Sequence, residues 1–320
     1  MISPEEWARA VRAIDQSVSL AVCCHVAPDG DALGSMLGLA HYLQRRGKQV
    51  WTSWGGQTPT VPYQYAFLPG AERIVKHDEL PEQVEAFIAI DCADRKRLEL
   101  LIDRFEAAGT TINVDHHISN SHFGDINLVD PERASSCELA YELVQHLGGS
   151  VDAGEATCFY TGIVTDTGRF QYSNALPETL RVAAELREAG ADHLMVAQRV
   201  YESASFEQIR LLGTVLSRAK LEDGLVYSWL FFDELGKLGL EDTEDFIDSL
   251  RTIRGIKVAL LAKQQPAGWW KGSLRSRGEV DVAAVAKTFG GGGHAAAAGF
   301  SFEGELDQLI RQVKERLADT

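Results

Sequence analysis

The chain has 320 residues, of which 45% are hydrophobic and 24% charged, an ordinary globular composition with enough length for two domains with separate cores. Its formal net charge of −15 argues against binding to long nucleic acids, because such binding depends on clusters of Lys and Arg. No apolar run is long enough to span a membrane, and the five cysteines have no disulfide-type spacing, so we expect a cytoplasmic protein.

The first half of the chain alternates short apolar runs with amphipathic segments. Helices are predicted over residues 3–15, 32–46, 98–108, 135–147 and 155–164, and strands over 18–24, 49–53, 87–90 and 110–114. Alternation of strand and helix is typical of α/β proteins. The pattern therefore predicts a mostly parallel sheet with helices on both faces.

The second half begins with a helical stretch from 177 to 220 that carries no chemical motif, followed by apolar runs of β type. Strands are predicted over 225–232, 258–262 and 272–277, and a last helix over 304–317. We therefore predict a first domain over 1–190, a helical connector over 191–220 and a smaller α/β domain over 221–320. The connector's apolar stripe could pair with a second copy, giving a homodimer, or pack on its own domain.

Acidic and histidine side chains follow several predicted strands of the first domain. These are His25, Asp29 and Asp31 after the first strand, Asp91 and Asp94 after the third, and Asp115, His116 and His117 after the fourth. Asp166 interrupts a further apolar segment. Because ligands bind at the carboxyl ends of strands in open α/β sheets, we expect these side chains to converge.

Such a group of carboxylates would repel one another without a counter-charge. Aspartate and histidine ligands without cysteine favour Mn²⁺ over zinc, and Mn²⁺ or Mg²⁺ over calcium. Paired divalent metals, about 3.5–4 Å apart, serve attack by water on phosphorus. The alternative is that these residues are polar turns closing the strands, and Asp115-His116-His117 taken alone does not exclude it.

The second domain contains the run Gly290-Gly291-Gly292-Gly293-His294 before its last predicted helix. Four glycines can be a flexible linker, but apolar residues flank this run on both sides. Glycines also let the backbone approach a ligand and direct N–H groups at phosphate. Arg275 could bind phosphate through two N–H groups. Trp269-Trp270 could be surface packing or a base-stacking platform, and we favour packing.

These motifs, in this order and spacing, resemble those of the DHH/DHHA1 family of phosphoesterases over nearly the whole chain. The resemblance is to members that degrade very short oligoribonucleotides and dephosphorylate pAp. It implies a cytoplasmic, manganese-dependent hydrolase, with Mg²⁺ as a second option for the metal. It also implies that residues 1–190 form the catalytic DHH domain and 221–320 a substrate-binding DHHA1 domain, with the substrate held between them.

The resemblance implies a role for each candidate residue. One metal ion would be held by His25, Asp29 and Asp91, and the other by Asp31, Asp91, His116 and Asp166. Asp91, His116 and His117 would be the catalytic residues, with His117 facing the scissile phosphate, and Asp94 and Asp115 would support them. Arg275, Gly292, Gly293 and His294 would bind the distal nucleotide.

Four alternatives stay open at this point. The main substrate could instead be cyclic di-AMP or its linear product pApA. A long-strand exonuclease is disfavoured by the acidic composition, and a family-II pyrophosphatase by the glycine-rich run with His294. A non-catalytic nucleotide-binding module would be expected to lack some metal ligands, and none is missing here.

Overall fold

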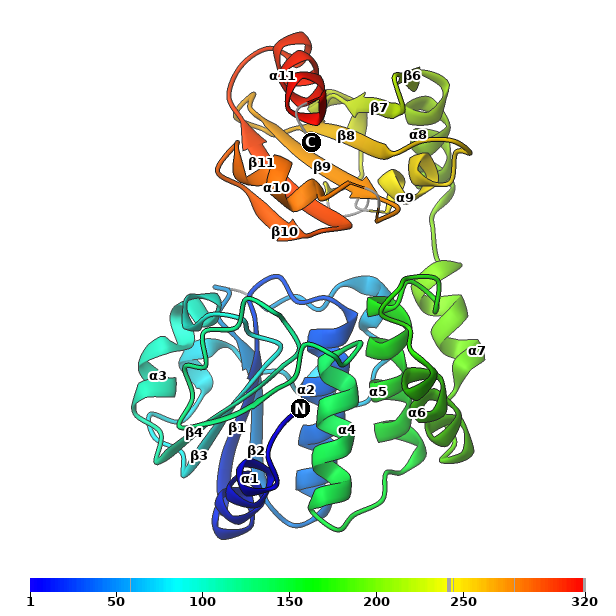
Figure 1. Cartoon of the computed structure of the whole chain (residues 1–320). Coiled ribbons are helices and arrows are strands. Elements are labelled where there is room, and N and C mark those ends of the chain that lie inside the picture. The colour runs from blue at the N-terminus through cyan, green and yellow to red at the C-terminus, as the bar shows by residue number, and fades with distance from the viewer. Residues whose placement is uncertain (58, 241–242, 244, 279, 319–320) are drawn as a thin grey trace. The chain divides into compact units, whose positions relative to one another are not determined.

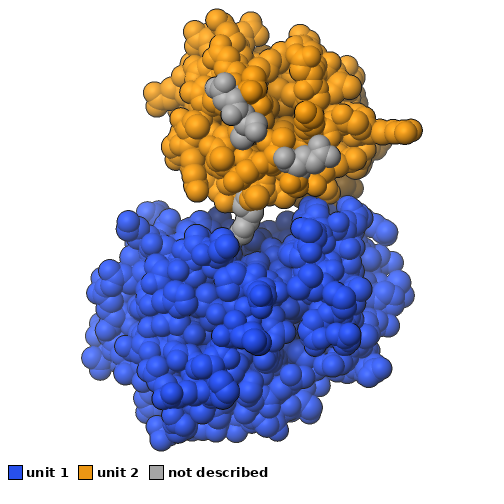
Figure 2. All heavy atoms as spheres, viewed as in Figure 1, with its two compact units in different colours: residues 1–203 blue, residues 204–320 orange. Residues whose placement is uncertain are grey.

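The computed structural model describes residues 1–57, 59–240, 243, 245–278 and 280–318 (Figure 1). They form two compact units, residues 1–203 and residues 204–320 (Figure 2). The division falls inside the 191–220 segment that the sequence assigns to a connector. In the part of the chain that is described, no helix combines the length and apolar character needed to cross a bilayer.

The first unit contains a five-stranded sheet in the order β2-β1-β3-β4-β5, with every neighbouring pair parallel. The strands are β1 (Ser19–Cys24), β2 (Gln49–Trp54), β3 (Ala86–Ile90), β4 (Thr110–Asp115) and β5 (Ile126–Val129). The predicted parallel sheet is confirmed. The sequence did not indicate β5, because the strand has only four residues and lies between polar loops.

Helices cover both faces of this sheet, as predicted. The larger core lies against α1 (Pro4–Gln16), α2 (Gly30–Arg45), α4 (Ser136–His146) and α5 (Ala153–Asp166). The other face packs against a 3₁₀ segment (Arg95–Leu101) and α3 (Ile102–Glu106). The prediction of one helix over 98–108 is wrong, because Glu99 has φ 42° and ψ −111° and interrupts it. The apolar residues whose spacing predicted one helix belong to two short segments, the 3₁₀ segment and α3.

The predicted continuous helical stretch over 177–220 is also broken. It contains α6 (Pro177–Glu188), α7 (His193–Val196), a π-helical turn (Ala197–Tyr201) and α8 (Phe206–Ser217). Gly190, with φ 103°, follows α6, a position where glycine ends helices at little cost. Ser205 starts α8 through a reciprocal capping box with Gln208. Each of these breaks lies at residues that stop or start a helix, so the local sequence determines where these helices end and begin.

The second unit is a six-stranded sheet in the order β10-β11-β9-β8-β7-β6, in which only the β7–β8 pair is parallel. The strands are β6 (Lys220–Glu222), β7 (Leu225–Leu230), β8 (Val258–Gln264), β9 (Trp270–Ser276), β10 (Gly292–His294) and β11 (Ala297–Phe302). One face packs on α10 (Val282–Lys287) and α11 (Leu306–Ala318), the other on α8 and α9 (Phe246–Arg251). Trp270 is 3% exposed and meets Phe231 edge-on, so it packs in the core and not at the surface.

Helices α2 and α5 approach each other closely at glycines. A Cβ at Gly34 would lie 2.4 Å from the carbonyl oxygen of Cys158. A Cβ at Gly162 would lie 2.2 Å from Cys137 Sγ and 2.8 Å from an Asp31 carboxylate oxygen. These distances are far below normal contact, so a larger side chain would push α5 away from α2. The start of α2 therefore depends on these glycines for its approach to the end of α5.

Gly34→Ala should lower the free energy of unfolding by about 1–3 kcal/mol, the usual cost of overpacking a closely packed core. Gly213→Ala is the matched control, because a Cβ there meets no atom within 4 Å and α8 is helical at that position. It should be neutral or raise stability by up to about 1 kcal/mol. Urea unfolding of both variants tests this, and equal effects would contradict the tight crossing.

Candidate metal centre

The turn from β1 into α2 presents three of the predicted ligands. Asp29 caps α2, since its Oδ1 accepts hydrogen bonds from the backbone N–H groups of Asp31 and Ala32, both at 3.0 Å. Asp31 lies in the first turn and is 1% exposed. Its carboxylate accepts from the backbone N–H groups of Ser136 and Cys137, at 2.6 and 2.9 Å. The start of α4 therefore holds Asp31 in place.

His25 follows β1 and is buried, with Nε2 3.4 Å from Asp91 Oδ2. Its Nδ1 lies 2.8 Å from the carbonyl oxygen of Val26 and 2.9 Å from Arg97 Nη2. When Nδ1 carries the proton and donates to Val26, Nε2 has a free lone pair for a cation. Burial by itself would lower the pKa of His25, but the hydrogen bond with Asp91 and the negative charges of Asp91 and Asp29 together outweigh it and raise the pKa.

Asp91 follows β3 and lies among the three histidines, with 3% of its surface exposed. Its φ is 55°, in the left-handed region that residues with a side chain rarely occupy. Ser136 donates its hydroxyl to Asp91 Oδ1 at 2.9 Å. Strain of this kind persists only where the surroundings hold the residue, and it is common at functional sites.

The two histidines after β4 face different partners. His116 Nε2 lies 3.7, 3.8 and 3.9 Å from carboxylate oxygens of Asp166, Asp91 and Asp31. His117 Nδ1 lies 2.7 Å from Asp115 Oδ1. Burial would lower the pKa of His117, but the hydrogen bond to Asp115 and the nearby carboxylates raise it to about 9. His117 is therefore a cation at neutral pH.

Asp115 supports His117 from the fully buried end of β4. Its second oxygen accepts a hydrogen bond of 2.5 Å from the Asn120 amide, which also donates to the side-chain oxygen of Asn113 at 2.8 Å. Both oxygens of Asp115 thus have protein partners. Asp94 lies further out, where it is exposed and caps the 3₁₀ segment through Lys96 N–H.

The predicted ligand atoms form three overlapping groups, each within 4.8 Å. They are His25 with Asp29 and Asp91, Asp31 with His116 and Asp166, and Asp91 with His116 and His117. Asp91 and His116 are each shared by two groups. The structure therefore brings together, at one edge of the sheet, all six of the predicted metal ligands together with His117.

The charges at this edge fit divalent cations. Burial raises the pKa of Asp31, and the nearby Asp91, Asp166 and Asp29 raise it further. Burial, with Asp29 and Asp91 close by, also raises the pKa of Asp166 to about 7. Among the described residues, no Lys or Arg forms an ion pair with Asp29, Asp31, Asp91 or Asp166. A mixed oxygen and nitrogen set without a paired Lys or Arg among the described residues suits Mn²⁺ or Mg²⁺.

The other predicted residues lie in the second unit. Strand pairing aligns Arg275 with Ala297, and Ala297 with His294, so the glycine-rich run and Arg275 share one end of that sheet. Arg275 Nη1 donates to the Leu274 carbonyl at 3.1 Å, and its Nε lies 3.9 Å from Asp248. Gly292 and Gly293 belong to β10. The side chain of His294 lies outside the described residues.

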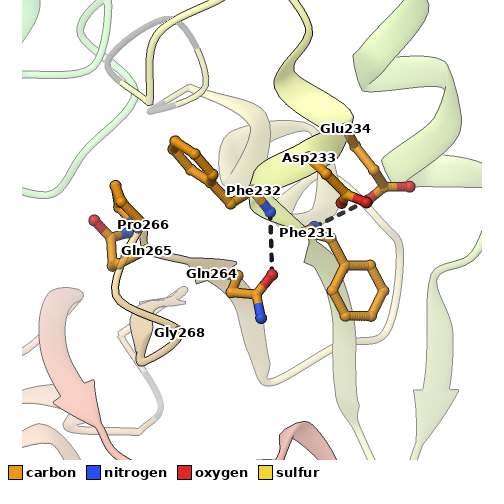
Figure 3. A pocket seen from close by; sticks show the side chains of 8 residues that line it. All are labelled: Phe231, Phe232, Asp233, Glu234, Gln264, Gln265, Pro266 and Gly268. Atoms are coloured by element: carbon orange, nitrogen blue, oxygen red, sulfur yellow. Dashed lines mark hydrogen bonds between the residues drawn. The ribbon is translucent and has the colours of Figure 1, made fainter.

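Two other features fit the predicted chemistry poorly. A hollow of about 540 Å³ in the second unit is lined by Phe231, Phe232, Asp233, Glu234, Gln264, Gln265, Pro266 and Gly268 (Figure 3). It contains no basic residue for a phosphate. A further group of His41, Asp152 and Glu155 includes a carboxylate that already accepts two hydrogen bonds from Arg45, at 3.0 and 2.9 Å.

Sequence reasoning missed the residues that hold the ligands. The sequence pattern places Ser136 only at the start of a predicted helix, and it indicates no role for Asn120. The local signal for Asn120 is its position three residues after His117. It lies in the loop that follows β4, and this loop has to fold back against β4. For Ser136 no local signal existed, because its partner Asp91 is 45 residues away in the chain.

Comparison with known proteins gives consistent matches over the whole chain. Residues 19–163 match the model of the DHH family, N-terminal domain, and residues 238–319 the model of the DHHA1 domain. A Thermus thermophilus protein named bifunctional oligoribonuclease and PAP phosphatase NrnA is 34% identical, covering 98% of this chain and 92% of its own.

Two further matches extend this comparison. A cyclic-di-AMP phosphodiesterase, PdeA, from Listeria monocytogenes is 27% identical over 88% of this chain but only 44% of its own. The crystal structure of an exopolyphosphatase-related protein from Bacteroides fragilis superposes with a TM-score of 0.93 and 27% identity, covering 100% of this chain and 97% of that one. The fold is therefore shared by proteins with several phosphate substrates.

Asp166→Asn should stabilise the metal-free protein while weakening its response to metal. A carboxylate whose pKa is raised on folding destabilises the folded state once it ionises, so removing the charge should add about 1 kcal/mol or more at neutral pH. The gain should vanish well below pH 3.8, the usual pKa of the carboxyl, where it is protonated in both states, and grow as the pH rises towards 7.

Thermal unfolding in chelator and in Mn²⁺, across this pH range, measures both effects. Wild type should melt higher with Mn²⁺ than with chelator, and Asp166→Asn should lose most of that difference. A variant that is less stable than wild type in chelator and still responds fully to Mn²⁺ would contradict the metal centre.

Proposed function

The chain belongs to the DHH family with a C-terminal DHHA1 domain, and on this basis we propose that it is a metal-dependent hydrolase that cleaves oligoribonucleotides of about 2–5 nucleotides to mononucleotides and converts pAp to AMP and phosphate. The observation that carries the proposal is the convergence of four carboxylates and three imidazoles on one sheet edge. The named activity of the Thermus thermophilus relative supports the substrate class.

We assign the six metal-binding residues to two sites. His25, Asp29 and Asp91 would hold one ion. Asp31, Asp91, His116 and Asp166 would hold the second, so that Asp91 is common to both. Two bound Mn²⁺ ions, or Mg²⁺ in their place, would neutralise charge on the phosphate and make water a better nucleophile.

His117 has a separate task in this proposal. It is cationic because Asp115 accepts its Nδ1 proton, and Asn120 keeps Asp115 in position. His117 can therefore donate a charge-assisted hydrogen bond to a phosphate oxygen. Asp115 and Asn120 fix the orientation of the imidazole, which reduces the loss of freedom when substrate binds.

The second unit would bind the distal part of the substrate. Arg275 carries a guanidinium that can donate two parallel hydrogen bonds to phosphate. The backbone N–H groups of Gly292 and Gly293 can approach a ligand because these residues have no side chain. His294 completes this set in our proposal. The strongly acidic composition agrees with a short substrate, because it would repel a long polyanion.

Cyclic di-AMP or pApA is the second candidate substrate, favoured by the similarity to the Listeria monocytogenes phosphodiesterase. We also propose a cytoplasmic location, because all five cysteines are free and buried, as suits a reducing compartment. Formation of a homodimer is a further part of the proposal. Leu194 and Met195 on α7, 61% and 40% exposed, are apolar surface that a second copy could cover.

The proposal is tested by manganese-dependent hydrolysis of pAp, pApA, a trinucleotide, cyclic di-AMP and a long oligoribonucleotide. Turnover should be highest on pAp and the short oligomers and fall with length, and chelator should abolish it. Asp91→Ala should lose about 10³-fold or more, because it removes a ligand common to both ions.

Three results would count against the proposal. Equal rates on the trinucleotide and the long strand would favour an exonuclease for long substrates. A preference for cyclic di-AMP would favour the second candidate. An Asp91→Ala protein that folds normally, as judged by circular dichroism, and keeps its rate would rule out the two-metal site.

Arg275→Ala should weaken capture of nucleotides without emptying the metal centre. We expect kcat/KM on pAp to fall by about 10-fold or more, since charge-assisted hydrogen bonds are worth about 1.5–3 kcal/mol. A small chromogenic phosphodiester lacks the distal part and should be affected much less. Manganese content should stay at the wild-type level.

Arg277→Ala is the matched control, two residues further along the chain. Its guanidinium donates to the carbonyl groups of Arg251, Thr252 and Ile253 at the end of α9, so it has a structural task. This variant should treat both substrates alike. A uniform loss in Arg275→Ala on both substrates, or no loss, would remove the assignment of Arg275.

A further inference from the structure

The first turn of α4 begins with two serines that are both fully buried but have different partners. Ser135 is the N-cap residue, and its hydroxyl oxygen accepts a hydrogen bond from the backbone N–H of Glu138 at 3.3 Å. Ser136 points its hydroxyl the other way and donates to Asp91 Oδ1 at 2.9 Å. One serine thus completes the helix, and the other contacts the centre of the candidate site.

Asp91 needs an external restraint to keep its conformation. Its backbone has φ 55°, and its carboxylate is almost completely buried. Its N–H donates to the carbonyl of Val114, which fixes the backbone but not the side chain. The imidazole nitrogens nearest to the carboxylate are 3.4 Å away or more, on His25, His117 and His116. Among the described residues, the hydroxyl of Ser136 is the closest hydrogen-bond donor to this carboxylate.

The same turn also holds Asp31. The backbone N–H groups of Ser136 and Cys137 donate to its two oxygens, at 2.6 and 2.9 Å, where the positive end of the helix dipole favours a negative charge. Ser136 therefore contacts two carboxylates. Its hydroxyl donates to Asp91, and its backbone N–H donates to Asp31. A shift of α4 would move both carboxylates together.

We infer that Ser136 is a positioning residue that orients the Asp91 carboxylate for metal binding. The inference rests on the proposed metal centre, in which Asp91 is shared by both ions. The hydroxyl donates to Oδ1 and leaves Oδ2, which lies 3.4 Å from His25 Nε2, without a hydroxyl partner among the described residues. It also stabilises the ionised form, which a metal ion requires. Removing a hydrogen bond that holds a metal ligand in this way weakens the affinity of the site for the metal about 10–100-fold.

The test compares Ser136→Ala with Ser135→Ala, which removes the same atom one residue earlier. Binding of Mn²⁺ to the metal-free protein is measured from the electron paramagnetic resonance signal of free Mn²⁺. Ser136→Ala should bind Mn²⁺ about 10–100-fold more weakly. Ser135→Ala should keep affinity within about 3-fold of wild type and instead lower the melting temperature of the metal-free protein, because a helix cap is lost.

Further variants make the result decisive. Ser136→Cys retains a weak donor, so its affinity should lie between those of wild type and Ser136→Ala, and it serves as the test should the alanine variant fold poorly. Asp91→Ala is measured in parallel. If Asp91→Ala binds Mn²⁺ like wild type, the proposed metal centre itself fails.

If Asp91→Ala loses binding but Ser136→Ala and Ser136→Cys keep it, only the role of Ser136 fails. Equal weakening in the Ser135 and Ser136 alanine variants would show a general effect of the helix start and would also overturn the inference. The same holds if Ser136→Ala loses kcat/KM at wild-type Mn²⁺ affinity, since Ser136 would then contact the substrate.

Discussion

The concentration of buried negative charge at one edge of the first sheet is the constraint on which the rest of this structure depends. Asp31 and Asp91 are almost fully buried, and no Lys or Arg among the described residues pairs with them. Burial and mutual repulsion raise the pKa of Asp31, whereas the histidines around Asp91 lower its pKa against the effect of burial. Charge arranged in this way is costly for folding and becomes favourable when cations bind.

Besides the histidines, neutral groups of the surrounding structure compensate part of that cost. The start of α4 supplies two backbone N–H groups to Asp31 and a hydroxyl to Asp91. The close crossing of α2 and α5 keeps the end of α5, and Asp166 with it, near the same edge. Hydrogen bonds from neutral groups orient the carboxylates but leave their net charge unbalanced, so the attraction for divalent cations is preserved.

The second unit has a different kind of sheet from the first. Its sheet is mixed, and its glycine-rich strand β10 lies at the edge, next to β11. Gly293 in this strand has φ 143°, and a Cβ there would lie 2.4 Å from the carbonyl oxygen of Ala297, so the close pairing with β11 requires glycine at this position. This strand lies within residues 238–319, which match the DHHA1 domain.

The sequence by itself determined the parallel α/β sheet, the two-domain organisation and which carboxylates and imidazoles would meet. It could do so because strand ends are local features and parallel strands bring their ends to one edge. It did not determine the break at Glu99, the short strand β5 or the role of Ser136. Those depend on contacts between segments far apart in the chain, such as the 45 residues that separate Asp91 from Ser136, and only the tertiary structure decides such contacts.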